Sequence, residues 1–325
     1  LLTLGVCAMA LGGAAPPQAA APAPLAIEAF AEIPQIQDPQ ISPNGKRIAG
    51  KIAIRGTQLF AVISPGSGEP PKLINPGKSD LNGWYWVNDE WLVISTGQQV
   101  PVDGFSWYVT RSFGYSVDSG KVTRLARDAA QNGGNVIWRA RDGSARVLLS
   151  FQTSPIFEDV GFWPQVDEVD LATGKRRNVV RSTPGVFNWY ADGDGVVRMG
   201  IGTADEGRSR RLLYRDSADA AFRTIDRVAK REQRLIVPTL FLRDSGKALV
   251  IDDDEGGFSA LYELDLATLE RGKQLFASKG YDIEGIVTDP TGFGYLGVAV
   301  NENRPHIRWT DPAMVAMQAA VSDLV

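Results

Sequence analysis

One motif recurs six times along the chain: a short turn built around aspartate or asparagine, followed by a run of apolar or β-branched residues. The copies are SPNGKRIAG (42–50), WVNDEWLVIS (86–95), RARDGSARVLLS (139–150), ADGDGVVRMGIG (191–202), LRDSGKALVID (242–252) and TDPTGFGYLGVAV (288–300). With Asn44, Asn88, Asp142, Asp194, Asp244 and Asp289 as anchors, successive copies lie 44, 54, 52, 50 and 45 residues apart. A period of this length indicates a repeat architecture.

A second pattern follows the first in most copies: a strand, a tight turn and a basic strand. It covers residues 59–74, 112–125, 165–180, 211–225 and 260–276. Some of these strands alternate with period two, as in VDEVDL (166–171) and YELDL (262–266), which predicts one packed face and one solvated face. Two hairpins in each unit make about four strands, which is one blade of a β-propeller.

The sequence therefore predicts an all-β protein, a β-propeller with about six visible four-stranded blades. A β-sandwich also has turn signals every 8–12 residues or so, but it does not predict a paired pattern that repeats over six units. We place the propeller at residues 27–325 and expect it to be incomplete at the C-terminus.

The two ends of this region differ from the repeats. Residues 27–40 (IEAFAEIPQIQDPQ) have a helix-like composition that is broken at Pro34 and Pro39. At the other end, Asp311-Pro312 is typical of a helix start, and Met314, Met317, Val321 and Leu324 then follow at helical spacing. We expect this helix to be still running at Val325.

Residues 1–26 carry no charge: an apolar run at 1–11 precedes an Ala/Pro-rich stretch at 12–26. This is typical of an export signal whose start is cropped, followed by a linker, and it predicts a periplasmic or secreted protein. Cys7 is the one cysteine in the sequence, and Val6 stands where a lipoprotein signal needs a small residue, so we do not expect a lipid anchor at Cys7. The net charge of −4 offers no basic surface for nucleic acid or anionic membranes.

A catalytic nucleophile is hard to find. The nearest approach to a G-x-S-x-G elbow is GFSWY (104–108), which lacks the second glycine. His306 is the one histidine in the sequence, so any Ser-His-Asp triad would have to use it, and nothing around it suggests a partner. We interpret His306 as structural and assign no catalytic residue.

Metal and cofactor motifs are equally weak. The run Asp252–Glu255 lacks the spacing of a calcium loop and is interpreted as a solvated hairpin tip. The DGDG at 192–195 has the residues that a tight turn requires. The Gly292–Gly294 segment lies in sequence that is predicted to form a strand, not in a phosphate loop. We therefore assign no metal-binding or cofactor-binding residue and expect no cofactor.

Aromatic and basic clusters are also given structural interpretations. The aromatic residues Trp84, Tyr85, Trp86, Trp91, Trp107 and Tyr108 are expected to wedge between blades, and a sugar-stacking surface is the alternative. The arginine-rich segments 208–215 and 227–234 are expected to be solvated faces.

Two stretches resemble one known family. IEAFAEIPQIQDPQISPNGKRIAG (27–50) resembles the opening of the N-terminal propeller in bacterial S9-family serine peptidases, the prolyl oligopeptidase and acylaminoacyl-peptidase group. RPHIRWTDPAMVAMQAAVSDLV (304–325) resembles a later element of the same proteins. The resemblance implies a parent with a seven- or eight-bladed propeller that admits short peptides to a C-terminal α/β-hydrolase domain. No position here matches the triad of that domain, so the resemblance implies a substrate-gating propeller without catalytic power of its own.

Two other functions stay open at this stage. One is a stand-alone periplasmic propeller that binds a partner protein, as TolB-like modules do; it predicts a ring closed by strand pairing between the two ends. The other is a propeller hydrolase with its site in the central channel, which needs converging carboxylates or histidines.

Overall fold

The chain forms six antiparallel sheets in chain order, which we call blades 1 to 6. The computed structural model describes residues 36–54, 56–102, 104–204, 209–224 and 236–324. Within these residues, blades 1 to 5 have four strands each and blade 6 has three, and the hydrogen-bonded neighbours are always consecutive strands. The predicted export signal at 1–26 and the arginines at 227–234 lie outside the described residues.

The strands of blades 1 to 3 are β1 (Ile36–Ile41), β2 (Ile48–Ile54), β3 (Thr57–Ile63), β4 (Lys72–Ile74), β5 (Asp80–Trp86), β6 (Trp91–Val102), β7 (Phe105–Ser116), β8 (Val122–Arg124), β9 (Asn135–Arg139), β10 (Arg146–Phe151), β11 (Gln165–Asp170) and β12 (Arg176–Val180). Those of blades 4 to 6 are β13 (Val186–Ala191), β14 (Val197–Ala204), β15 (Ser209–Tyr214), β16 (Arg223–Thr224), β17 (Pro238–Phe241), β18 (Lys247–Asp253), β19 (Ser259–Asp265), β20 (Arg271–Phe276), β21 (Ile283–Thr288), β22 (Tyr295–Asn301) and β23 (Pro305–Trp309). The one α-helix of the described residues is α1 (Pro312–Ser322).

The six repeated turns all join the first strand of a blade to the second. The side chains of Asn44, Asn88, Asp142 and Asp289 close their turns by accepting backbone hydrogen bonds, and in the turn of blade 4 Asp192 does so. Asn88 Oδ1 accepts from the backbone N–H of Trp91 at 2.7 Å, and Asp142 Oδ1 accepts from Ser144 at 3.0 Å. Asp244 takes a φ of 50°, in the left-handed region that aspartate tolerates. The period in the sequence is therefore the period of this hairpin.

The second repeated pattern forms the hairpin between the third and fourth strands of blades 1 to 5. In blade 3, Asp170 Oδ1 accepts from the backbone N–H of Thr173 at 2.8 Å, and in blade 5 Asp265 Oδ1 accepts from that of Thr268 at the same distance. Both predicted hairpins are confirmed.

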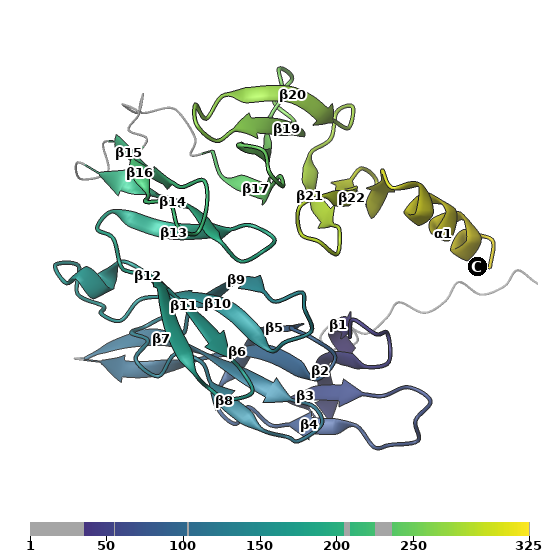
Figure 1. The fold of residues 1–325 in the computed structure, drawn as a ribbon. Helices are drawn as coiled ribbons and strands as arrows, with labels where there is room; N and C mark the ends of the chain where they lie inside the picture. Colours follow the sequence, from purple (N-terminus) through teal and green to yellow (C-terminus); the bar gives the residue numbers. More distant parts are fainter. Residues whose placement is uncertain (1–35, 55, 103, 205–208, 225–235, 325) are drawn as a thin grey trace, which may run out of the picture.

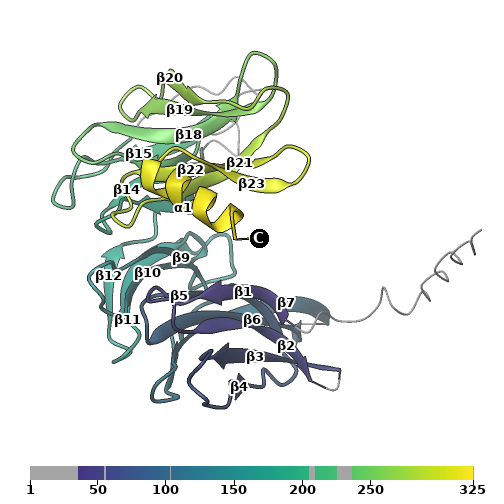
Figure 2. The same cartoon turned by 90° about the vertical axis from the view of Figure 1, so that its right-hand side faces the viewer.

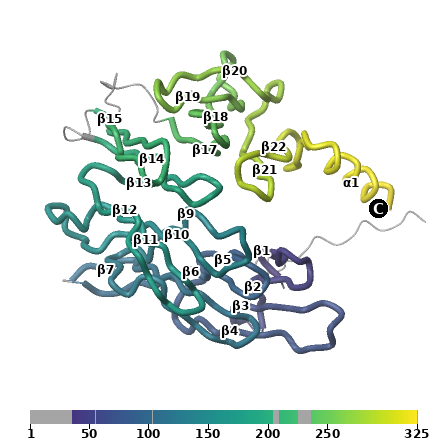
Figure 3. The backbone as a smooth tube through the Cα atoms, viewed as in Figure 1, coloured from purple at the N-terminus to yellow at the C-terminus, as the bar shows by residue number. Residues whose placement is uncertain are grey.

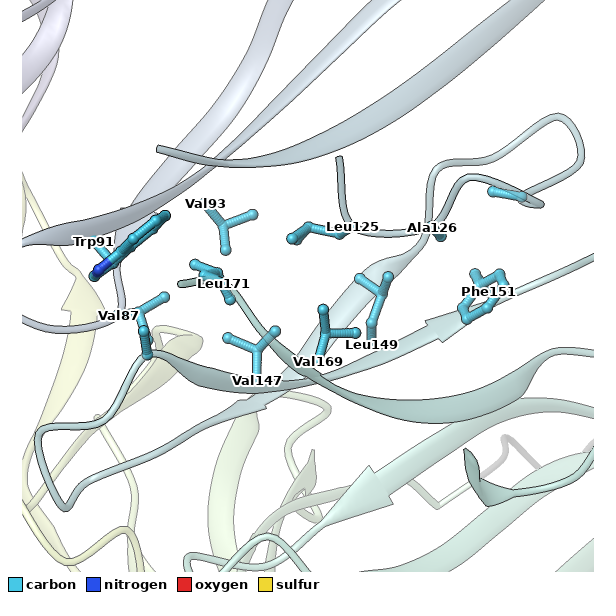
Figure 4. Close-up of a cluster of buried hydrophobic side chains, with 12 residues drawn as sticks. Val87, Trp91, Val93, Leu125, Ala126, Val147, Leu149, Phe151, Val169 and Leu171 are labelled. Atoms are coloured by element: carbon cyan, nitrogen blue, oxygen red, sulfur yellow. The ribbon is translucent and has the colours of Figure 1, made fainter. Parts of the chain in front are cut away.

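Apolar clusters fill the space between successive blades. Five of them are found in the described residues, and each joins one blade to the next, from blades 1 and 2 to blades 5 and 6. Figure 4 shows the cluster between blades 2 and 3, in which side chains from β6 meet those of β10 and β11. Its labelled members are Val87, Trp91, Val93, Leu125, Ala126, Val147, Leu149, Phe151, Val169 and Leu171.

Both faces of an inner blade are therefore packed. In β11, Val169 belongs to the cluster with blade 2, whereas Val166 belongs to the cluster with blade 4. The expectation that strands such as 166–171 have one solvated face is wrong, because each inner blade lies between two others. Face-to-face packing of successive twisted sheets around an axis is the arrangement of a β-propeller.

The sheets follow one another around an arc (Figures 1 and 3). In Figure 1 the first strands β9, β13 and β17 face the centre of the arc, and β12, β16 and β20 lie on its outer side. The view in Figure 2 shows α1 beside blade 6, on the side that turns back toward blade 1. Within the described residues, no strand of blade 1 joins the sheet of blade 6, so the ring is not closed by strand pairing between these blades.

The two ends correct the sequence reading in part. Residues 36–40 belong to strand β1, so the helix-like interpretation of 27–40 is wrong for them; Asp38 has a φ of 48° and the pairing with β2 shifts register there, next to Pro39, which has no N–H to donate. At the other end the helix is confirmed, with Asp311 Oδ1 accepting from Ala313 at 3.0 Å. It ends at Ser322, so the expectation that it is still running at Val325 is wrong. No described helix is long and apolar enough to cross a membrane.

Candidate functional site

The axis of the propeller contains a cavity of about 440 Å³. It lies between the first strands of blades 2 to 5 and is completed by the repeated turns of blades 3, 4 and 6. A smaller cavity of about 280 Å³ lies against β9, β13 and β17 and shares Ile137 and Ala191 with the first. The residues that line the larger cavity are Tyr85, Val136, Ile137, Trp138, Arg139, Arg141, Ala191, Asp192, Gly193, Leu240 and Gly292. We call it the axial cavity.

The repeated turns contact one another along one face of the ring, which we call the repeat-turn face. The turns of blades 1 and 2 meet where the backbone N–H of Asn44 donates to Asp89 Oδ1 at 2.8 Å. Those of blades 2 and 3 meet where Asn88 Nδ2 donates to the Gly143 carbonyl, also at 2.8 Å. Trp138 Nε1 on β9 donates to the Gly193 carbonyl in the turn of blade 4 at 2.9 Å.

The contacts continue on the far side of the axis. The guanidinium of Arg243, in the turn of blade 5, lies 4.0 Å from the centre of the Phe293 ring in blade 6 and 3.4 Å from Asp194 in blade 4. Arg141 Nη1 in blade 3 donates to the Pro290 carbonyl in blade 6 at 2.8 Å. This last bond joins turns 149 residues apart and links blades that are not neighbours in the chain. The residues that mark the repeat in the sequence thus surround one end of the axis.

Two arginines and a tyrosine supply the polar groups of the axial cavity. Arg139 donates to the Trp86 carbonyl, and Arg141 donates to the carbonyls of blade 6. Neither guanidinium has a carboxylate salt-bridge partner among the described residues. Burial lowers the pKa of Arg141, with repulsion from Arg139 adding to the effect and the Asp289 carboxylate opposing it. The cavity is therefore cationic.

Tyr85 is the most unusual of these groups. Its ring packs against the apolar cluster between blades 2 and 3. Its hydroxyl is buried and has no hydrogen-bond partner among the described residues. Burial raises the pKa of Tyr85, and the nearby Arg139 opposes the shift, so the phenol stays neutral and is a hydrogen-bond donor.

The carboxylate in the cavity wall is already neutralised. Asp192 is buried and pairs with Arg198 at 3.2 Å. Its other oxygen accepts from the backbone N–H groups of Asp194 and Val196, at 3.1 and 3.0 Å. Asp192 therefore serves the turn of blade 4 and forms no ion pair with Arg139 or Arg141.

The sequence candidates for a triad are far apart in the chain's architecture. His306 lies on β23 in blade 6, with Nδ1 3.0 Å from the Arg304 carbonyl and Nε2 3.5 Å from Glu302. Ser106 lies on the long β6–β7 hairpin of blade 2 and donates to Gln99 at 2.8 Å. Ser106 and His306 therefore lie in different blades, and no hydrogen bond joins them.

The acidic tip and the glycine-rich turns occupy hairpins. Residues 252–255 span the end of β18 and the turn that follows, where Asp254 Oδ1 accepts from Gly256 and Phe258. Among the residues that the structure describes, no group of three or more His, Cys, Asp and Glu side chains is placed to hold a metal ion. The DGDG at 192–195 forms the turn between β13 and β14, as predicted.

The aromatic cluster divides into two groups. Trp84, Trp86 and Trp91 are buried at the blade interfaces, as expected. Trp107 and Tyr108 lie half-buried on the β6–β7 hairpin, and Trp107 lines a separate cavity of about 570 Å³.

The solvated face expected for 208–215 is wrong at Arg210. This side chain is only 6% exposed, because β15 is the third strand of a blade that is packed on both faces.

The sequence reasoning missed the axial cavity altogether. The sequence pattern places Tyr85 in an aromatic cluster and Arg139 and Arg141 in the third repeat, and it does not link them. A signal was present: two arginines flank Ala140 beside the third anchor, at the end of the first strand of that repeat.

Six blades around an axial cavity define the chain as a β-propeller protein. No protein-family model matches it, and no curated protein matches it. Among solved structures, a prolyl endopeptidase is similar with a TM-score of 0.51 and 15% identity, over 84% of this chain and 42% of that chain. At this identity the likeness shows the fold alone, and the chain spans less than half of that enzyme's length.

Two further structures are similar at lower TM-scores. An oligogalacturonate lyase in complex with manganese has a TM-score of 0.49 and 12% identity, over 83% of this chain and 74% of that chain. The propeller domain of the trilobed protease from Pyrococcus furiosus has a TM-score of 0.47 and 17% identity, over 86% of each chain.

Proposed function

We propose that the chain is the propeller of an exported S9-type serine peptidase and limits which peptides reach a hydrolase domain of the same protein. The observation that carries the proposal is the axial cavity between the first strands of blades 2 to 5. Its volume of about 440 Å³ lies in the range of small-ligand sites. A folded domain of 100 residues has a radius of gyration of about 13 Å and is excluded by such a space.

Three observations support the family and the location. The opening segment 27–50 and the closing segment 304–325 both resemble S9 propellers. The prolyl endopeptidase named above shares the fold. The uncharged, Ala/Pro-rich residues 1–26 support export. In this proposal, the propeller contributes selection by size, and the acyl-enzyme chemistry belongs to the hydrolase domain.

The test uses the full-length product of the gene and a fluorophosphonate probe, which labels activated serines. We expect labelling of the full-length protein and none of the 325-residue chain alone. A second measurement compares acyl-aminoacyl anilides, peptides of increasing length and a folded protein as substrates. Rates should fall with size and vanish for the folded protein. Full-length protein that neither takes the probe nor cleaves short peptides would overturn the proposal and favour a stand-alone module that binds a partner.

A further inference from the structure

We propose that the axial cavity is a carboxylate-binding site formed by Tyr85, Arg139 and Arg141, and that it holds the free carboxylate of a short peptide. The inference rests on the proposed function for its ligand, a peptide, but its evidence is the arrangement of these three side chains. They come from blades 2 and 3 and line one cavity at the repeat-turn face.

The hydroxyl of Tyr85 is buried without a partner among the described residues. An unpartnered buried hydroxyl costs roughly 1–3 kcal/mol in a folded protein, so such groups are rare and call for a reason. The Tyr85 hydroxyl has no partner among the described residues, while its ring is held by the cluster between blades 2 and 3. The neutral phenol of Tyr85, close to the Arg139 guanidinium, can donate a hydrogen bond but has no acceptor among the described residues.

Two arginines give the cavity a positive charge. Arg139 and Arg141 are exposed residues, and each uses one nitrogen to hold a backbone carbonyl. Their remaining N–H groups have no carboxylate or carbonyl partner among the described residues, and a guanidinium carries five donors in all. Bidentate pairing with a planar carboxylate is the interaction that this donor geometry favours.

The carboxylates near the cavity already have partners of their own. Asp192 is held by Arg198 and by backbone N–H groups, as described above. Asp289 Oδ1 accepts from the Thr291 hydroxyl at 2.7 Å and from the Gly292 backbone N–H at 2.8 Å. Both acids therefore stabilise turns of the repeat-turn face, and a ligand carboxylate would supply the acceptor that the Tyr85 hydroxyl lacks among the described residues.

The cavity also fits the body of such a ligand. Apart from its charged groups, the wall is formed by apolar side chains such as Ile137 and Leu240, together with the backbone of Gly193 and Gly292. Small ligand sites combine an apolar lining with a few polar groups that set orientation. A short peptide would place its carboxylate on the arginines and its side chains against the apolar wall.

The experiment measures binding of defined peptides to the full chain by isothermal titration calorimetry. The probes are N-acetyl-trialanine with a free carboxylate, the same peptide as its C-terminal amide, an amidated peptide with one internal glutamate, and inorganic phosphate. We expect the free carboxylate to bind at least about tenfold more tightly than the amide, since charge-assisted hydrogen bonds are lost with the amide. The glutamate peptide tells whether a side-chain carboxylate also serves.

Variants assign the site. Tyr85→Phe should weaken binding of the free carboxylate roughly tenfold with an unchanged melting temperature, because the hydroxyl has no partner to lose in the free protein. Arg139→Gln should weaken it further. The matched control is Arg177→Gln, which removes the same charge from a side chain 70% exposed on β12 and should leave binding unchanged.

Several results would overturn the inference: equal binding of carboxylate and amide, binding by phosphate alone, or a Tyr85→Phe variant that binds like the wild type. Since Tyr85→Phe removes one buried atom without a hydrogen bond, it keeps the test valid even where Arg139→Gln does not fold. None of these results bears on probe labelling or on size selection, so the proposed function is judged separately.

Discussion

Replacing Arg176 with methionine should destabilise the protein strongly, although this arginine lies on an outer strand. Arg176 Nε is 3.0 Å from the carboxylate of Asp167, whose side chain is 3% exposed. Its Nη2 also donates to Asp128 at 2.9 Å, and that carboxylate is 47% exposed. One guanidinium thus holds a buried acid of blade 3 and a surface acid that follows blade 2.

The two halves of this interaction differ in energy. Removing one partner of a buried ion pair costs about 3–5 kcal/mol, because the other charge stays buried. Asp167 keeps hydrogen bonds from Gln165 Nε2 at 3.0 Å and Asn178 Nδ2 at 2.8 Å, which places its loss near the lower end. The exposed pair with Asp128 adds about 0–1 kcal/mol. We expect Arg176→Met to lower the free energy of unfolding by about 3–4 kcal/mol in total.

Urea denaturation followed by tryptophan fluorescence measures this change. The double variant Arg176→Met with Asp167→Asn should recover about 2 kcal/mol of the loss, because the orphaned charge is gone. Arg177→Met is the control: its side chain is 70% exposed, and the change should stay within about 0.5 kcal/mol. If Arg176→Met unfolds at the wild-type midpoint, or if Asp167→Asn rescues nothing, the reasoning from burial is wrong.

Three other expectations follow from the packing and the turns. Leu149→Ala, in the core between blades 2 and 3, should cost about 2–5 kcal/mol by chemical denaturation; a loss below about 1 kcal/mol would contradict the packing. Gly202→Ala should cost on the order of 3 kcal/mol by the same assay, since a Cβ there would lie 1.6 Å from the Gly185 carbonyl oxygen; wild-type stability would refute the close approach. Hydrogen bonds from Ser144, with help from Arg146, lower the pKa of Asp142 from 3.8 to about 2, so its stabilising effect should be complete above pH 3.8 and be lost as the pH falls through about 2; NMR titration of the carboxyl carbon tests this, and a midpoint at 3.8 would contradict it.

Much of the fold could be predicted from the sequence because its signals are local. Asn88 and Asp142 close their turns through hydrogen bonds to backbone groups two or three residues away, and these bonds depend on residue type and spacing alone. The sequence on either side of each turn has the β-branched and apolar residues that a sheet requires. Six blades, and the hairpins inside them, follow from such local signals.

The errors have a common cause, which is that burial is not local. The alternation at 166–171 suggested a solvated face, yet blade 4 covers that face in the folded protein. Arg210 reads as a surface residue and is buried for the same reason. The charge of Asp167 is tolerated inside because Arg176, on the neighbouring strand, reaches it.

By itself, the sequence determined the repeat, the propeller class and the weakness of every catalytic or metal motif, because turn chemistry and residue type act over a few positions. Only the tertiary structure decided the axial cavity. Tyr85 and Arg139 lie 54 residues apart, as the second and third copies do, and they meet because successive blades rotate about one axis. Arg141 contacts Pro290 in blade 6 because the curved row of blades brings the turns of blades 3 and 6 together. The angle between blades is set by how the buried side chains of each interface pack, and no stretch of sequence within one repeat contains that information.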